Sequence, residues 1–191
     1  MALPRFLSAI VAGAMLASSL VLADEIGDIR QQFQQGDLAG ALDRADRYLV
    51  QNPGNAQVRF LKGLILDDQG KPDAAIEVFT ALTEDYPELP EPYNNLAVIH
   101  AAQGRYGSAL NALEMAIRAR PGYATAHENL GDIHAKMASV AYEEALALDS
   151  RNTTAQTKLT LMRTLLEKQA FKPAASRSLQ TTPESAPSQD R

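Results

Sequence analysis

The fold is decided by residues 56–123, which form two consecutive segments of 34 residues, AQVRFLKGLILDDQGKPDAAIEVFTALTEDYPEL (56–89) and PEPYNNLAVIHAAQGRYGSALNALEMAIRARPGY (90–123). Three residue types recur between the segments at this spacing: Gly70 and Gly104, Ala75 and Ala109, and Pro87 and Pro121. The same columns continue upstream as Gly36, Ala41 and Pro53. A constant period of this length is typical of stacked supersecondary units rather than of one globular fold.

The residues inside each segment resemble the tetratricopeptide repeat (TPR), whose signature is W-x2-L-G-x2-Y, then A-x3-F, then P. The segment from Pro90 matches it with Tyr93, Leu96-Ala97, His100, Ala109, Leu113, Ala116 and Pro121. The segment from Ala56 contributes Gly63, Leu66, Ala75, Phe79, Leu82 and Pro87, and the next one opens with His127, Leu130-Gly131 and His134. The resemblance covers roughly residues 24–150. It implies an all-α fold, a TPR-type α-solenoid of antiparallel helix pairs.

We therefore predict a TPR domain over residues 24–170 with units at about 22–55, 56–89, 90–123 and 124–150. In such an array no unit can bury its apolar face alone, so neighbouring units must stack. Small residues such as Ala97 and Ala109 allow the two helices of a unit to approach closely, and Pro87 and Pro121 end the second helix. The polar helix near residues 26–33 suits a terminal unit that faces water.

The fourth unit is five residues shorter than the others between its two helices. The lost segment is the glycine-containing turn, and its replacement, Ala135-Lys136-Met137-Ala138, consists of good helix formers. We therefore predict one fused helix over about 124–149, roughly 39 Å long at 1.5 Å per residue. A capping helix over 152–170, beginning at an Asn152-Thr153 N-cap, should fold back onto Val140, Ala141, Ala145 and Leu148.

The two ends of the chain differ from the array in composition. Residues 1–23 combine Arg5 with an apolar run and end at Ala23, which predicts a signal peptide cleaved after Ala23. We accordingly expect an exported protein of bacterial type in the periplasm. The alternative is that residues 1–23 stay in place as a membrane anchor, and the mass of the mature chain distinguishes the two. Residues 171–191 are rich in proline, serine, threonine and glutamine, which predicts a disordered tail.

Several function classes have no support in the composition. A net charge of −5 and a pI of 5.2 disfavour nucleic acid as a partner. The chain has no cysteine, and it lacks the motifs of a serine hydrolase, a zinc protease or a phosphate-binding loop. The three histidines have no carboxylate at ligand spacing, so we assign no metal, no other cofactor and no catalytic residue.

The TPR resemblance implies instead that the concave face, lined by the first helix of each unit, binds a partner. Its candidate residues are Phe60, Leu64, Asp67, Asp68, Glu91, Asn94, Asn95, Val98, Glu128, Asn129 and Asp132. Asn95 and Asn129 stand one period apart, at a position where family members often hold a ligand's peptide backbone. Acids outnumber the single base Lys136 on this face, so the lysine and arginine clamp that some members use for a terminal carboxylate is not implied.

We therefore expect a non-catalytic adaptor or scaffold of the cell envelope that binds another protein, or a peptide segment of one, in its TPR groove. Two alternatives stay open: a membrane-tethered assembly factor, and a regulatory subunit of an envelope enzyme. Activity of the purified chain alone would argue for an enzyme and against an adaptor.

Overall fold

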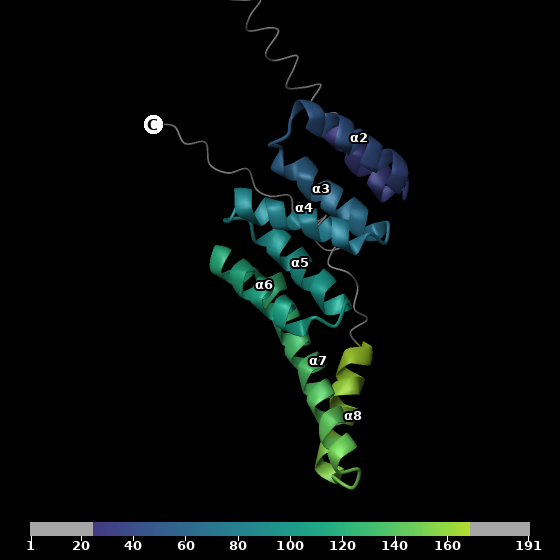
Figure 1. Ribbon diagram of the computed structural model, residues 1–191, viewed down its shortest axis with the longest axis vertical. Coiled ribbons are helices and arrows are strands. Elements are labelled where there is room, and N and C mark those ends of the chain that lie inside the picture. The colour runs from purple at the N-terminus through teal and green to yellow at the C-terminus, as the bar shows by residue number, and fades with distance from the viewer. Residues whose placement is uncertain (1–24, 169–191) are drawn as a thin grey trace, which may run out of the picture. The chain divides into compact units, whose positions relative to one another are not determined.

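The computed structural model describes residues 25–168, and every regular element in that range is a helix (Figure 1). A helical stretch over residues 25–34 is followed by α2 (Leu38–Gln51), α3 (Ala56–Asp68), α4 (Pro72–Asp85), α5 (Pro90–Ala102), α6 (Tyr106–Ala119), α7 (Ala124–Leu148) and α8 (Thr153–Lys168). The predicted all-α architecture of helix pairs is confirmed. The predicted signal peptide (1–23) and tail (171–191) lie outside the described residues. The chain forms two compact units that divide between Ala75 and Ile76, inside α4.

Three glycines make the turns inside the helix pairs. Gly36, Gly70 and Gly104 have φ angles of 80°, 70° and 73°, in the left-handed region that glycine adopts without a steric cost. In each case the next residue's amide bonds back to a carbonyl of the preceding helix, as Lys71 does to Leu66 at 2.9 Å and Arg105 to His100 at 2.9 Å. This helix-ending geometry explains why a glycine recurs every 34 residues.

The first unit packs the 25–34 helix, α2 and α3 around small and branched side chains, with Ile29, Ala45 and Val58 fully buried. Its helices are capped by side chains: Asp37 Oδ1 accepts from the Gly40 amide at 3.0 Å, and Asn55 Oδ1 accepts from the Val58 amide at 2.9 Å. Gln69 Nε2 donates to the Leu38 carbonyl at 2.9 Å. The last bond ties the end of α3 to the beginning of α2.

The second unit has its core between α5, α6 and the first half of α7. Ala97, Ala109, Leu113, Ala116 and Ile133 meet there, all nearly or fully buried. The alanines are the small residues of the repeat pattern, and they sit where helices must approach closely. Helix α5 is buried on every side from residue 90 to residue 99.

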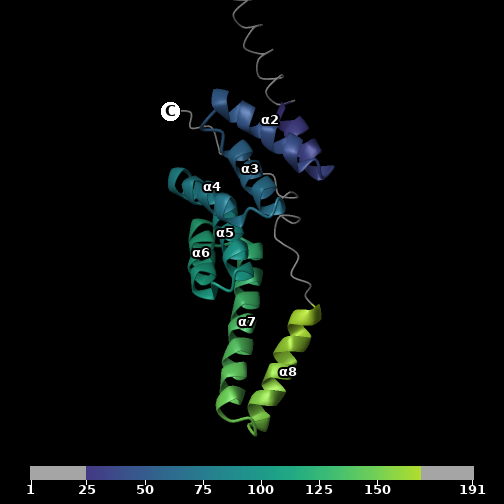
Figure 2. The same ribbon diagram turned by 45° about the vertical axis from the view of Figure 1, so that its right-hand side comes forward.

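The predicted fusion in the fourth unit is confirmed, because α7 runs for 25 residues without a turn. α8 follows it and lies alongside its second half in both views (Figures 1 and 2). Asn152 caps α8 as predicted, its Oδ1 accepting from the Ala155 amide at 2.9 Å. Buried Ala155 and Leu159 form the inner face of α8.

The expected contact face of α7 was partly wrong. Val140 and Ala141 are exposed, and Leu148 is 91% exposed, whereas Ser139 is buried. α8 contacts the side of α7 that carries Ser139 and Tyr142, and the Lys158 ammonium lies 5.6 Å from the centre of the Tyr142 ring. The apolar pattern alone did not distinguish this side of the helix from the neighbouring one.

Candidate protein-binding surface

Four of the predicted binding residues belong to α3, in the first unit. Leu64 is buried, Phe60 and Asp67 are half-buried, and Asp68 is exposed. Burial raises the pKa of both carboxyl groups, and the charge of Asp68 raises that of Asp67 further. Burial therefore destabilises the charged form of each carboxyl group, and a nearby cation would stabilise it.

Glu91, on α5 in the second unit, is engaged within the protein. Its Oε1 accepts from Arg120 Nη1 at 2.9 Å, although only 6% of the Glu91 side chain is exposed. The Arg120 guanidinium in turn lies 5.9 Å from the centre of the Tyr123 ring. Burial, followed by the charge of Glu91, raises the pKa of Tyr123 to about 12. Glu91 thus belongs to a structural ion pair, and its charge is already compensated.

Two asparagines of successive first helices are bonded to each other, a contact that the sequence did not predict. Asn129 Nδ2 on α7 donates to Asn94 Oδ1 on α5 at 2.8 Å. Asn95, which is one period before Asn129, instead donates from Nδ2 to the Glu91 carbonyl of its own helix at 2.9 Å. Asn94 is 1% exposed, and its Nδ2 finds no acceptor among residues 25–168. Asn94 therefore accepts from Asn129 through Oδ1, while its buried Nδ2 donor is left unpaired among these residues.

The remaining predicted residues differ in exposure. Val98 on α5 is buried, Glu128 on α7 is exposed, and Asn129 and Asp132 are half-buried. Because Asn129 is partly open to solvent, a ligand could reach the asparagine pair only from the α7 side. The α3 residues belong to the first unit, and the α5 and α7 residues belong to the second.

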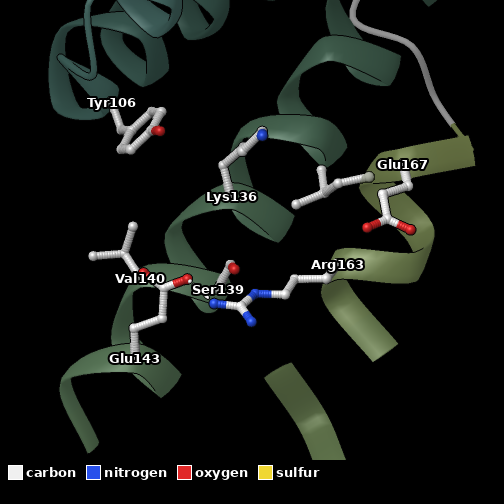
Figure 3. Close-up of a pocket in the computed structure, with 8 residues that line it drawn as sticks. Tyr106, Lys136, Ser139, Val140, Glu143, Arg163 and Glu167 are labelled. Carbon is white, nitrogen blue, oxygen red and sulfur yellow. Dashed lines mark hydrogen bonds and ion pairs between the residues drawn. The ribbon is translucent and has the colours of Figure 1, made fainter. Parts of the chain in front are cut away.

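A hollow that was not predicted from the sequence lies at the α7–α8 hairpin. This cavity of about 480 Å³ is lined by Tyr106, Lys136, Ser139, Val140, Glu143, Arg163, Leu166 and Glu167. Figure 3 shows Arg163 reaching from α8 toward Glu143 of α7, and the Nη2–Oε1 distance is 3.0 Å. Lys136, expected in the groove, lines this cavity instead. Two bases and two acids balance one another there, so the lining has no net charge to select an ion.

The three histidines lie on α5 and α7 and differ in exposure. His127 and His134 are exposed, whereas His100 is half-buried, and its pKa is lowered by burial and by Arg105. No group of histidine and acidic side chains within residues 25–168 is arranged to hold a metal ion. In the same range, no helix has both the length and the apolar character needed to cross a membrane.

Comparison with known proteins identifies two relatives, each matched over part of its length. A chloroplastic tetratricopeptide repeat domain-containing protein, PYG7, of Arabidopsis thaliana is 35% identical over 77 residues, covering 38% of this chain and 26% of the relative. A probable biofilm formation methyltransferase, WspC, of Pseudomonas putida is 36% identical over 85 residues, covering 42% of this chain and 20% of the relative. The chain thus spans about a quarter or less of these curated relatives.

Solved structures and family models agree on the fold. The type III secretion chaperone SycD of Yersinia enterocolitica, solved with a peptide of the translocator YopD, superimposes with a TM-score of 0.57 at 16% identity, covering 61% of this chain and 95% of that one. The family model described as tetratricopeptide repeat matches residues 29–90 and 94–155. Together these ranges hold 124 of the 191 residues. The chain therefore belongs to the tetratricopeptide repeat family.

Proposed function

We propose that this protein is a non-catalytic adaptor that binds a segment of another protein against α5 and α7. The observation that carries the proposal is the Asn94 Nδ2 amide, a buried donor without an acceptor among residues 25–168, next to Asn129. Leaving a buried donor unpaired costs about 1–3 kcal/mol. A peptide carbonyl is an acceptor of the right kind to recover that cost.

The comparisons support this class of function. The chaperone SycD was solved with a peptide of its translocator, and it shares the fold of this chain. Because Asn94 is nearly fully buried, a bound segment enters beside half-exposed Asn129 and parts the side chains above Asn94. The asparagine pair would then bind the ligand through its backbone, which every peptide has. Specificity would come from the flanking side chains.

A point substitution at Asn94 tests the proposal. The probes are peptides selected on the full-length chain from a random-peptide display library. We expect Asn94→Leu to weaken their binding by at least about tenfold, the equivalent of one buried hydrogen bond. Asn111→Leu is the matched control, because Asn111 is exposed on α6. This variant should bind the peptides with unchanged affinity. Equal affinities of the two variants, both folded by circular dichroism, would refute the role of Asn94.

We further propose that Asp67 and Asp68 attract basic groups of the partner. Their raised pKa values mean that a bound cation would stabilise the charged form of both carboxylates. Charges at a partly exposed surface act mainly on the rate of association and are screened by salt. The preferred ligand therefore has apolar anchors and basic or neutral flanks.

This charge effect is measurable as a salt dependence. For a lysine-flanked peptide, we expect the association rate with the native chain to fall as salt is raised, and the fall to be smaller in Asp67→Asn/Asp68→Asn. The control Glu84→Gln/Glu88→Gln removes the same two charges from exposed positions. If both double variants have the same salt slope, net charge alone explains the effect, and the specific role of Asp67 and Asp68 is wrong.

We place this adaptor in the cell envelope because residues 1–23 have the composition of a cleaved signal peptide. Retention of that segment would make the same protein a membrane-tethered assembly factor. The similarity to part of a probable methyltransferase keeps a regulatory subunit of an enzyme as the second candidate.

A further inference from the structure

The first half of α7 has an uncovered face at the positions where the repeat pattern places its own second helix. In the preceding unit these positions are Tyr93, Leu96 and Ala97, all buried, and half-buried His100. Their counterparts on α7 are exposed His127, half-buried Leu130, exposed Gly131 and exposed His134. A Cβ added at Gly131 would meet no atom within 4 Å. The small residue that normally permits a close helix approach is present, but no helix within residues 25–168 approaches it.

The residues that match the absent second helix follow in the same chain, shortly after Gly131. Ala138, Tyr142 and Ala145 follow the second-helix pattern set by Ala109, Leu113 and Ala116. They lie on the same continuous helix as Gly131, and Ala138 is about 10 Å beyond it at 1.5 Å per residue. Without the five-residue turn, this second half of α7 points away and cannot fold back onto the first half.

We propose that a second copy of this chain supplies the cover: the second half of its α7 packs on the first half of α7, and the exchange is reciprocal. A pattern whose two halves complement one another satisfies the self-complementarity that a two-fold dimer requires. Shortening the connection between two elements favours exchange between copies over folding within one chain. The two α7 helices would then run antiparallel along their whole length.

The repeat register specifies the contacts of this dimer. Ala97 and Ala109 of the third unit correspond to Gly131 of one copy and Ala138 of the other. The same register places His127 beside Tyr142 of the second copy, and Arg120 beside Asp149 of the second copy. The last two are opposite charges, both substantially exposed in the single chain. α8 packs next to buried Ser139, and Tyr142 lies at the edge of that contact, where the Lys158 ammonium is 5.6 Å from its ring centre. Ala138, Tyr142 and Ala145 all stay partly open for the second copy.

Restoring the turn tests the exchange directly. We expect the full-length chain to have the mass of a dimer by light scattering after size exclusion. Inserting Gly-Asn-Tyr-Asp-Glu between Met137 and Ala138 puts a glycine back in the column of Gly104. The second helix can then fold back within one chain, and the mass should fall to that of a monomer while the helical circular dichroism is kept. A monomeric native chain, or an insertion variant that stays dimeric, would overturn the proposal.

Disulfide formation tests the register, because the chain has no cysteine of its own. In Gly131→Cys/Ala138→Cys the two Cα atoms of one helix are about 10 Å apart, beyond the roughly 7 Å that a disulfide can span. Oxidation should therefore link two copies and give a dimer band on a non-reducing gel. The off-register variant Gly131→Cys/Ala145→Cys and both single variants should stay monomeric on that gel. Equal cross-linking in all four would show random collision and refute the register.

Discussion

Truncating Leu113 to alanine is expected to lower the free energy of unfolding by about 2–5 kcal/mol, the usual range for a buried leucine. Leu113 has no exposed surface and lies in the core of the second unit with Ala97 and Tyr123. Removing its branched end deletes apolar contacts and leaves a cavity, because the surrounding helices relax only partly. Urea unfolding followed by circular dichroism measures the change.

The matched control is the same substitution at Leu148, which is 91% exposed at the end of α7. Leu148→Ala should change the unfolding free energy by less than about 0.5 kcal/mol, as for other surface positions. A similar loss at both positions would mean that the core assigned to the second unit is wrong. A loss at neither position would mean that unfolding of this unit is not the transition being observed.

Enlarging Ala109 to leucine is expected to cost about 1–3 kcal/mol by the opposite mechanism, overpacking. Ala109 is fully buried on α6, and Ala97 on the facing helix is 1% exposed, so the extra carbons have no free volume. Ala75→Leu is the equivalent change in the preceding repeat, and it should behave alike because Ala75 is also fully buried.

Ala102→Leu serves as the control for overpacking, because Ala102 is exposed at the end of α5. Leucine and alanine are both good helix formers, so the intrinsic cost of the exchange is small. Thermal unfolding is measured for Ala109→Leu, Ala75→Leu and Ala102→Leu. The melting temperature should fall for the first two variants and stay nearly unchanged for the third. An unchanged melting temperature for both buried alanines would show that the helix register derived from the repeat is wrong.

The local elements of this protein follow from its sequence alone. The 34-residue period predicted paired helices, because the repeat places a glycine where a left-handed turn is required and a proline after the second helix. The loss of five residues predicted the fused α7 for the same reason: without a glycine turn, Ala135 to Ala138 continue the hydrogen bonding of a helix. These features depend only on residues that are close together in the chain, so they can be predicted from the sequence.

Contacts between helices were decided by the tertiary structure. The sequence placed Asn94 and Asn95 on the same surface, but only the rotation of α5 against α7 made Asn94 the partner of Asn129 and directed Asn95 to its own backbone. The sequence placed Glu91 among the acids of the groove, and the fold pairs it with Arg120, 29 residues away. α8 buries Ser139 of α7, whereas Val140 lies at the rim of the α7–α8 cavity and stays exposed. A rotation of one helix by a single residue position changes which side chain is buried, and packing of the whole core, which no local pattern encodes, sets that rotation.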